Sequence, residues 1–374
     1  MAIHVLKPLE RRIRKSLIRR TGFTGTLIRH PEDAIRLRPN PAILMLRAER
    51  IGDVLVTVPI IRAVRRQYPL GRIDVLLTDT NLHAAHAVSP WIDRVWIYHK
   101  RPVSALALVH KVRAERYDLL VDFQNGPSAT SQFVARWGGA ANVLGLLHEQ
   151  PAHLTHAVPM PDRRRVHIVD RLAQLLLAFG VDPEREPLDL EYRLSDIDRA
   201  RAAAQLQAVR SAHRLAVNIS GRGTDKYWGR NRFIEAIGFV QQHYPQLAVV
   251  VCGAPGDAAE VEAIAAATGA EPVPPLPFHA FASIIHECDL LLTPDTSVVH
   301  LAAAWKIPAV VLFREDPHTL PWVPYRSPHR AIVQPGPLAG IALERVMEAL
   351  AQLIEETWPA LGAERETTTV RIGQ

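Results

Sequence analysis

Short apolar runs rich in β-branched residues alternate with stretches of helical periodicity, twice over, along most of this 374-residue chain. The first set runs from residue 42 to residue 123, and the second runs from residue 214 to residue 313. Strands that alternate with helices are typical of parallel sheets covered by crossover helices. The sequence therefore predicts an α/β protein with two Rossmann-like, doubly wound domains.

The pattern places each expected element. Strands are expected at residues 42–46, 72–78, 94–98, 117–123, 214–220, 247–253, 289–293 and 308–313, and helices at 103–115, 166–180, 231–244, 258–268, 297–305 and 341–358. The two sets are separated by a segment rich in His, Pro and Arg and by a second, Pro-rich segment. The predicted domains are an N-terminal extension, residues 1–40; a first Rossmann-like domain, 41–185; a second, 186–340; and a C-terminal helix and tail, 341–374. Two such domains facing each other leave a cleft at the carboxyl ends of their strands, where open α/β sheets bind ligands.

The basic charge of the chain is concentrated in its first 30 residues, which hold eight Lys/Arg against one acid. The rest of the chain holds 36 basic and 37 acidic residues. Within residues 3–20, apolar residues recur at spacings of three and four, which predicts a basic amphipathic helix. Such a helix suits an anionic membrane surface, while a solvated helix packed on its own domain is the alternative. Nucleic acid is not expected as a partner, because the rest of the chain shows no basic groove with interleaved aromatic residues.

Composition and familiar motifs exclude several classes of protein. No apolar run approaches the roughly 18 residues needed to span a bilayer, and Cys252 and Cys288 do not suggest a disulfide framework. We expect a cytoplasmic protein, peripheral on the inner face of the cytoplasmic membrane. The sequence lacks a phosphate-binding P-loop, a strand-linked G-x-G-x-x-G, H-E-x-x-H, paired C-x-x-C and G-x-S-x-G. No metal site and no cofactor are predicted.

The turn "RAERIGD", residues 47–53, follows the first expected strand. Asp53 stands where a helix N-cap is expected, and the same carboxylate can serve as a general base toward an attacking hydroxyl. Gly52 lets a ligand approach the backbone closely. Arg47 and Arg50 either bind an anionic substrate or are ordinary surface charges.

Three loops of the second half carry phosphate-binding or sugar-binding chemistry. In "SGRGTDKYW", residues 220–228, Lys226 and the backbone N–H groups at the helix start make a site for phosphates. In "GAPGD", residues 253–257, the carboxylate either caps a helix or accepts hydrogen bonds from ribose hydroxyls. In "DTSVVH", residues 295–300, helix-start N–H groups offer a second phosphate or sugar contact. The candidate donor-binding residues are Ser220, Gly221, Thr224, Lys226, Asp257, Asp295, Thr296, Ser297 and His300.

Together these loops resemble the lipopolysaccharide heptosyltransferase family, glycosyltransferase family 9. The resemblance rests on R-x-x-R-x-G-D-V-x-x-x-x-P at 47–59, "YDLLVDFQ" at 117–124, "DKYW" at 225–228, "GAPGD" at 253–257 and "DTSVVHLAAAWKIPAVVLF" at 295–313. It implies the GT-B fold, no obligatory metal, and inverting transfer of heptose from ADP-heptose to the inner core of lipopolysaccharide. Ser297 and Asp257 depart from the glycine and glutamate usual in the family.

The resemblance also implies a role for each site residue. Asp53 matches the catalytic carboxylate, Lys226 the lysine that holds the ADP phosphates, and Asp257 the acid that contacts the nucleoside. The first domain would bind the acceptor, an anionic lipid-linked glycan, through Arg47, Arg50 and Gly52, and the second would bind the ADP-sugar donor. Two other functions fit the sequence: a GT-B nucleotide-sugar epimerase, and a non-catalytic glycan-assembly protein at the membrane surface.

Overall fold

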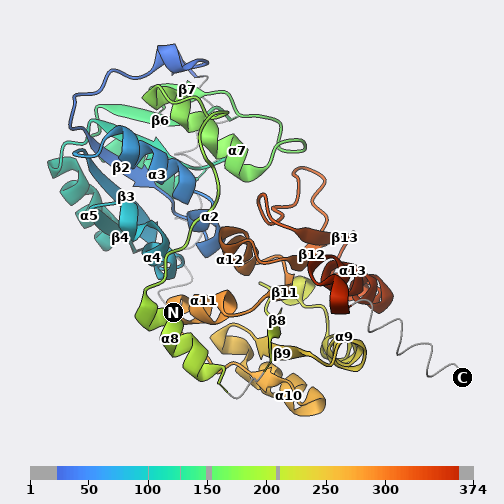
Figure 1. Cartoon of the computed structure of the whole chain (residues 1–374). Helices are drawn as coiled ribbons and strands as arrows, with labels where there is room; N and C mark the ends of the chain where they lie inside the picture. Colours follow the sequence, from blue (N-terminus) through green and yellow to red (C-terminus); the bar gives the residue numbers. More distant parts are fainter. Residues whose placement is uncertain (1–22, 100, 127, 149–153, 208–210, 362–374) are drawn as a thin grey trace, which may run out of the picture. The chain divides into compact units, whose positions relative to one another are not determined.

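The computed structural model describes residues 23–99, 101–126, 128–148, 154–207 and 211–361, and Figure 1 labels their helices and strands. The chain divides into two compact units, Met1–Leu188 and Asp189–Gln374. Each unit contains one parallel sheet with helices packed on it, so the predicted α/β fold with two doubly wound sheets is confirmed. The amphipathic helix expected at residues 3–20 lies outside the described residues.

The sheet of the first unit has seven parallel strands in the order β1-β7-β6-β5-β2-β3-β4. These are β1 (Thr26–Leu27), β2 (Ala42–Leu46), β3 (Arg72–Thr78), β4 (Arg94–Tyr98), β5 (Leu119–Asp122), β6 (Asn142–Leu146) and β7 (His156–Val158). All five residues of β2 are buried. Continuous burial of this kind is expected for the central strand of a parallel sheet, because helices cover both of its faces.

The helices of the first unit include those that the sequence pattern predicts at residues 103–115 and 166–180, and others that it does not predict. They are α2 (Ile51–Leu55), α3 (Val58–Gln67), α4 (Ala85–Val88), α5 (Pro102–Ala114), α6 (Ala129–Trp137) and α7 (Ile168–Ala173), with 3₁₀ turns η1 (Pro31–Asp33), η2 (Leu82–Ala84), η3 (Ser89–Trp91) and η4 (Gln174–Phe179). The helix expected over residues 166–180 is instead α7 followed by η4, which ends at Gly180 with φ +73°. The apolar run "LLLAF" has no polar face, so its periodicity does not distinguish an α-helix from a tighter turn.

The sheet of the second unit has six parallel strands in the order β10-β9-β8-β11-β12-β13. These are β8 (His213–Asn218), β9 (Leu247–Cys252), β10 (Glu271–Pro272), β11 (Leu290–Pro294), β12 (Ala309–Arg314) and β13 (His329–Gln334). The helices are α8 (Asp196–Gln205), α9 (Arg230–His243), α10 (Ala258–Thr268), α11 (Phe278–His286), α12 (Val298–Trp305) and α13 (Leu343–Thr357), with η5 (Thr224–Lys226), η6 (Pro255–Asp257) and η7 (Leu338–Gly340).

Each sheet is wound outward in both directions from a central strand. In the first unit the chain goes from β2 to β3 and β4, and then returns to β5 on the other side of β2. In the second unit it goes from β8 to β9 and β10, and then returns to β11 beside β8. The loops after β2 and β5, and after β8 and β11, therefore diverge at topological switch points, where open α/β sheets bind their ligands.

The second unit closes its core with the C-terminal helix. Six apolar residues of α13 belong to the same buried cluster as residues of the strands β8, β9, β11 and β12: Val346, Ala349, Leu350, Ala351, Leu353 and Ile354. Trp228 is fully buried there, and its Nε1 donates to the carbonyl oxygen of Ile341 at 3.1 Å. The two cysteines are buried and are not bonded to each other. None of the helices in the described residues is long and apolar enough to cross a membrane.

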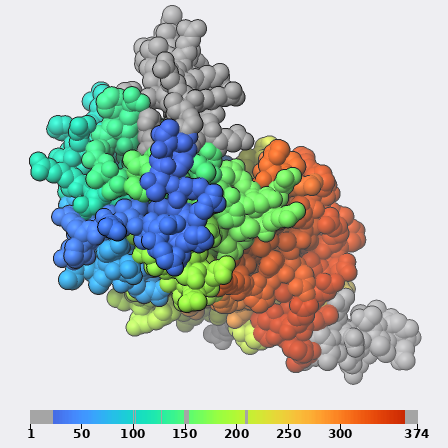
Figure 2. Space-filling model, turned by 90° about the horizontal axis from the view of Figure 1, so that it is seen from above, coloured from blue at the N-terminus to red at the C-terminus, as the bar shows by residue number. Residues whose placement is uncertain are grey.

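Part of the segment assigned to the N-terminal extension takes part in the first sheet. Strand β1 pairs in parallel with β7, with Thr26 opposite His156 and Leu27 opposite Ala157. The next residue, Ile28, is fully buried. Figure 2 shows this dark-blue segment on the surface of the first unit. Two residues are too few for a periodic signal, so the sequence pattern does not show this strand.

Candidate active site

Asp53 lies in the short helix α2, directly after the central strand of the first sheet. Its Oδ2 accepts a hydrogen bond from the backbone N–H of Arg50 at 2.9 Å, so the carboxylate holds the N-terminus of this helix. The residue is 6% exposed. The N-cap of α2 is Arg50, and Asp53 is the third residue of the helix, so Asp53 is not the N-cap that the sequence predicts; its carboxylate instead binds the N-cap backbone. This bond fixes the position of the carboxylate at the switch point between β2 and β5.

Arg47 has a different environment from the one expected for a residue that binds an acceptor. Its side chain is 1% exposed. Its Nε donates to the carbonyl oxygen of Asp53 at 2.9 Å, and its Nη2 donates to Asp53 Oδ1 at 2.9 Å. The third nitrogen, Nη1, donates to the carbonyl oxygen of Phe123 at 2.6 Å. The structure thus corrects the expectation for Arg47: its guanidinium holds Asp53 and joins the turn after β2 to the end of β5.

The other two residues of the turn with a predicted acceptor contact are accessible. Arg50 is exposed, and Gly52 is half-buried within α2. A direct contact between an acceptor and Arg50 or Gly52 stays a prediction.

The end of β5 adds polar groups that the sequence analysis did not assign to the site. Burial raises the pKa of Asp122 to about 6, although the N–H of Gln124, the Ser131 hydroxyl and the charge of Arg47 each lower it. The backbone N–H of Gln124 donates to Asp122 Oδ1 at 3.1 Å. The signal in the sequence was the polar pair Asp122 and Gln124 at the end of an otherwise apolar strand, next to the switch point.

In the second unit, the loop after β8 needs its glycines. A Cβ at Gly221 would lie 2.1 Å from the carbonyl oxygen of Lys226, so a larger residue would displace the backbone. Gly223 has φ +87°, a conformation that L side chains rarely adopt. The tight turn brings η5, which includes Thr224 and Lys226, to the carboxyl end of the central strand.

Lys226 binds the loop that follows β11. Its Nζ donates to the carboxylate of Asp295 and, at 3.2 Å, to the carbonyl oxygen of the same residue. The backbone N–H of Asp295 is bonded to Leu312 at 2.9 Å, which ties this loop to β12. The structure therefore brings together two predicted site residues that are 69 positions apart.

A second predicted pair lies at the same edge of the sheet. Ser220 Oγ donates to the carboxylate of Asp257 and accepts from the backbone N–H of Ala254 at 2.6 Å. Asp257 makes no side-chain cap bond to α10, which it precedes. Of the two roles considered for Asp257, the side-chain cap of α10 is not found, and the contact with ribose hydroxyls stays a prediction.

The loop after β11 contributes the N-terminus of α12. Asn218 Nδ2, at the end of β8, donates to Thr293 Oγ1 at 2.8 Å and to Thr296 Oγ1 at 3.4 Å. Ser297 is the N-cap residue of α12 and makes no side-chain cap bond. His300 lies one turn inside the helix, is 4% exposed, and has its ring 6.1 Å from that of Trp322. Thr296 and Ser297 are accessible at this edge, whereas His300 packs below it.

Arg314 is a charged residue at this edge that the sequence analysis did not select. It ends β12, and its guanidinium pairs with Asp225 at 2.9 Å while the side chain stays 50% exposed. Asp225 directly precedes Lys226, so two cations and two carboxylates lie around the loop after β8. A sequence feature could have identified Arg314 as a site residue, because it follows the apolar strand "AVVLF" directly.

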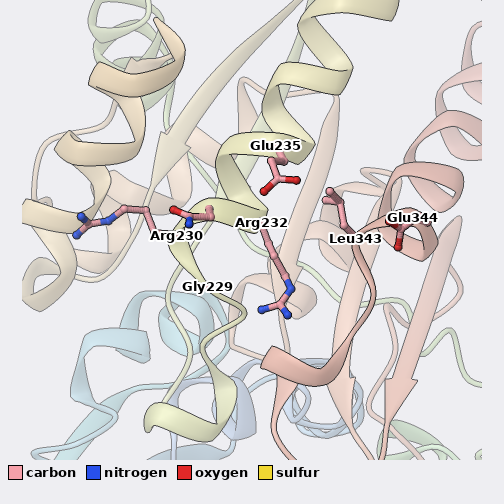
Figure 3. Close-up of a pocket in the computed structure, with 7 residues that line it drawn as sticks. Gly229, Arg230, Arg232, Glu235, Leu343 and Glu344 are labelled. Carbon is pink, nitrogen blue, oxygen red and sulfur yellow. The ribbon is translucent and has the colours of Figure 1, made fainter.

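A pocket of the second unit lies outside this cluster. It lies between the starts of α9 and α13 and is lined by Gly229, Arg230, Asn231, Arg232, Glu235, Leu343 and Glu344 (Figure 3). None of the predicted site residues lines it. Arg232 Nη1 donates to the carbonyl oxygen of Trp228 at 3.1 Å, and this bond joins the start of α9 to the end of the loop after β8. Within the described ranges, no group of three or more His, Cys, Asp or Glu side chains is placed to hold a metal ion.

Comparison with known proteins gives this arrangement a family. The family model for glycosyltransferase family 9 (heptosyltransferase) matches residues 105–335, more than half of the chain. The chain belongs to glycosyltransferase family 9. It is 24% identical over 292 residues to lipopolysaccharide heptosyltransferase 3 of Escherichia coli K12, a match that covers 73% of this chain and 82% of that protein. The predicted family and the predicted enzyme class, a glycosyltransferase, are confirmed.

Solved structures share the fold of this family member. The E. coli ADP-heptose lps heptosyltransferase II matches with a TM-score of 0.67 and 20% identity, over 84% of this chain and 99% of that one. The E. coli heptosyltransferase WaaC, solved with ADP, matches with a TM-score of 0.64 and 19% identity, over 86% and 99%. A UDP-GlcNAc 2-epimerase from Methanocaldococcus jannaschii matches more weakly, with a TM-score of 0.51, 13% identity, and coverage of 83% of this chain and 91% of that one. The fold is therefore GT-B, and the likeness to the epimerase concerns the fold alone.

Proposed function

We propose that this member of family 9 is an inverting, metal-independent glycosyltransferase that moves heptose from ADP-heptose to an anionic acceptor of the lipopolysaccharide core. The donor and the acceptor are supported by the names of its relatives, which include an ADP-heptose lps heptosyltransferase and lipopolysaccharide heptosyltransferase 3. The observation that carries the proposal is the cluster around Lys226. A lysine, a hydroxyl pair and a helix N-terminus gather at one switch point and suit a nucleoside diphosphate.

In this proposal the second unit binds the donor. Lys226 and the N–H groups of residues 220–224 hold the diphosphate, and Thr296 and Ser297 offer further donors at the start of α12. The Lys226 ammonium then neutralises charge that develops on the leaving diphosphate. Asp257, paired with Ser220 in the structure, is the acceptor for ribose hydroxyls.

The first unit supplies the base. Asp53 takes the proton from the acceptor hydroxyl as that oxygen bonds to the anomeric carbon, and the bond between this carbon and the diphosphate oxygen breaks. ADP leaves with the bonding electrons, and attack from the opposite face inverts the configuration. Each carboxylate oxygen of Asp53 already accepts one hydrogen bond, from Arg47 or from the Arg50 N–H, which leaves a lone pair on each for the proton. Arg47 acts as a positioning residue for this step.

A donor screen tests the proposal. Purified protein would be incubated with ADP-heptose and then with other nucleotide sugars, with and without deacylated lipopolysaccharide core, while the release of free nucleoside diphosphate is measured. Release of ADP that requires the core acceptor is the expected result. A new nucleotide sugar formed from the donor alone would identify an epimerase instead, and failure to bind any nucleoside diphosphate in calorimetry would favour a non-catalytic protein.

The remaining part of the proposal concerns location. Residues 3–20 hold the enzyme on the inner face of the cytoplasmic membrane, where a lipid-linked acceptor is available. The support is the charge and apolar spacing of this segment.

A further inference from the structure

The turn that carries Arg47 and Asp53 is bonded to the loop that follows the neighbouring strand. Strands β2 and β3 pair in parallel (Figure 1), and the backbone N–H of Arg47 continues this pairing by donating to the carbonyl oxygen of Leu76 at 3.1 Å. The end of β3 and the residues after it read "TDTN", residues 78–81. Past the bond of Arg47, side chains of this polar segment continue the connection to the turn.

Three side chains of the 78–81 segment bind three consecutive carbonyl oxygens of the turn after β2. The bonds run from Asn81 Nδ2 to Arg47 at 2.7 Å, from Thr78 Oγ1 to Ala48 at 3.4 Å, and from Thr80 Oγ1 to Glu49 at 3.0 Å. The bond of Asn81 is the shortest of the three. Because the three acceptors are consecutive, these bonds fix the course of the backbone from the end of β2 to the start of α2.

The side chain of Asn81 is itself held at both ends. Asn81 is fully buried, and its Oδ1 accepts a hydrogen bond from the backbone N–H of Thr78 at 2.8 Å. Its own backbone N–H donates to the carbonyl oxygen of Thr78 at 3.1 Å. Asn81 precedes η2 but makes no side-chain cap bond to it. The amide therefore joins two loops of the sheet and does not serve the helical turn that follows it.

The bond from Asn81 leads to the carboxylate of Asp53 through one residue. Asn81 holds the carbonyl oxygen of Arg47, and the guanidinium of Arg47 donates to both the carboxylate and the carbonyl oxygen of Asp53. Arg47 is 1% exposed, so bulk water does not replace a donor that is lost at its carbonyl oxygen. A buried carbonyl without a donor is unfavourable, and the backbone of Arg47 would shift to find another.

We propose that Asn81 is a positioning residue for the Arg47–Asp53 pair. Since it is buried, it acts through Arg47 and not on the substrate. Its effect on turnover rests on the proposed function, in which Asp53 is the base. A displacement of about 1 Å at a reacting group can slow a reaction by about 100-fold, so a bond that fixes the carboxylate contributes to the rate without contacting the sugar.

An Asn81→Leu variant tests this role, because leucine has a similar size and no donor. We expect kcat to fall by about 10- to 100-fold, while the Kd for ADP, which binds to the second unit in our proposal, stays within about twofold. Asn142→Leu is the matched control. Asn142 Nδ2 also donates to a backbone carbonyl oxygen, that of Asp118 at 3.0 Å, but it lies at the start of β6 and so at the opposite edge of the sheet. Both variants should melt at lower temperature than the wild type by similar amounts, and only Asn81→Leu should lose turnover.

A double mutant separates positioning of the base from a general structural role. If Asn81 acts through Asp53, then Asn81→Leu should cause no further loss of kcat in a protein that already carries Asp53→Asn. The same fractional loss of kcat in both backgrounds would show that Asn81 supports the fold alone, and it would overturn the proposal.

Hydrogen exchange measured by mass spectrometry tests the positioning without any substrate. The backbone N–H of Arg50 donates to Asp53 Oδ2, so its exchange reports on the place of the carboxylate. Peptides that cover residues 47–54 should exchange faster in Asn81→Leu than in the wild type, and at the wild-type rate in Asn142→Leu. Unchanged exchange there in Asn81→Leu, or an unchanged kcat, would overturn the proposal. A wild-type protein that transfers no sugar would count against the proposed function, and the exchange measurement would still decide whether Asn81 positions the pair.

Discussion

Asp53 and Arg47 show how a single pair of side chains links helix formation to chemistry. The carboxylate holds the start of α2 through the Arg50 N–H, and the guanidinium fixes the second carboxylate oxygen and the carbonyl of the same residue. If Asp53 is the base, as we propose, a carboxylate that is already held in place loses little conformational entropy when the acceptor binds. The sequence predicts a carboxylate at the start of a helix that follows a strand, although not its position as the third helical residue. The contacts of Arg47 depend on Phe123, 76 residues away, and so cannot be predicted from the local sequence.

Replacement of Asp53 by Asn tests the base. The amide keeps the size of the side chain and one oxygen for the Arg50 N–H, but it cannot take a proton. We expect kcat to fall by about 100-fold or more, the scale of a lost general base, while the affinity for ADP stays within about twofold, as measured by calorimetry. Asp33→Asn is the matched control, because Asp33 also accepts backbone N–H groups at the start of a short helix of this unit. Near-wild-type turnover of Asp53→Asn would remove Asp53 from the chemistry.

Replacement of Lys226 by Met tests the donor site. Loss of a charge-assisted hydrogen bond to a phosphate costs about 1.5–3 kcal/mol, which corresponds to about a 10- to 150-fold weaker Kd for ADP. The matched control is Lys306→Met, since Lys306 is also paired with a carboxylate of the second unit, that of Asp189. An ADP affinity that is unchanged in Lys226→Met would place the diphosphate elsewhere. The same titration with Arg314→Met would show whether this second cation takes part.

At the scale of helices and strands, periodicity predicts most of the fold. The alternation of apolar runs and helical stretches locates β2 to β5, β8, β9, β11 and β12, and the helices α5, α9, α10, α12 and α13. It misses the two-residue strands β1 and β10. It also misses β6, β7 and β13 and the helices α4, α6, α8 and α11. It also merges α7 with η4, because one unbroken apolar run supports both. Periodicity does not predict the order of the strands in a sheet. The contact between Lys226 and Asp295 therefore cannot be predicted from it.

The end of β5 carries a pH-dependent cost for the first unit. Burial holds the pKa of Asp122 at about 6, above its ordinary value of 3.8, so the folded state keeps this proton more tightly than the unfolded state. The stabilisation of the folded state by the protonated Asp122 is fully present below pH 4, and it is lost as the pH rises through 6. The Asp122→Asn variant lacks this titration. Relative to the variant, the wild type should lose about 2 kcal/mol of unfolding free energy between pH 4 and pH 7.

Urea unfolding of both proteins at several values from pH 4 to pH 7 measures this difference. The difference between the two free energies isolates Asp122 from the other titrating groups. The exposed Asp162 gives the matched control, and Asp162→Asn should follow the pH dependence of the wild type. Parallel curves for the wild type and Asp122→Asn would show that Asp122 has an ordinary pKa.

At the scale of the whole molecule, two sheets of the same winding have different polar groups at their switch points. The first has a buried carboxylate held by an arginine, and the second has a lysine, hydroxyls and a helix N-terminus. In the proposed mechanism, base chemistry in one unit and diphosphate chemistry in the other serve a sugar transfer. The sequence predicts this division, because each loop follows a recognisable strand. It does not predict the burial of Arg47, because an arginine after a strand looks the same in sequence whether or not the fold buries it.

The N-terminal segment provides the last prediction. The described residues begin at 23, and β1 and the buried Ile28 follow, so a protein without residues 2–22 keeps every described strand of the first sheet. Seven Lys/Arg lie within residues 3–20, and each contributes about 1 kcal/mol at an anionic surface. The full-length protein should therefore sediment with vesicles that contain anionic lipid and should be released by salt, which screens the attraction. The truncated protein should stay in solution and keep its turnover on a water-soluble acceptor.

Neutral vesicles are the control for charge, and Ile13→Asp, which interrupts the apolar spacing, is the control for insertion. Equal sedimentation of the full-length and truncated proteins would show that another surface holds the enzyme at the membrane.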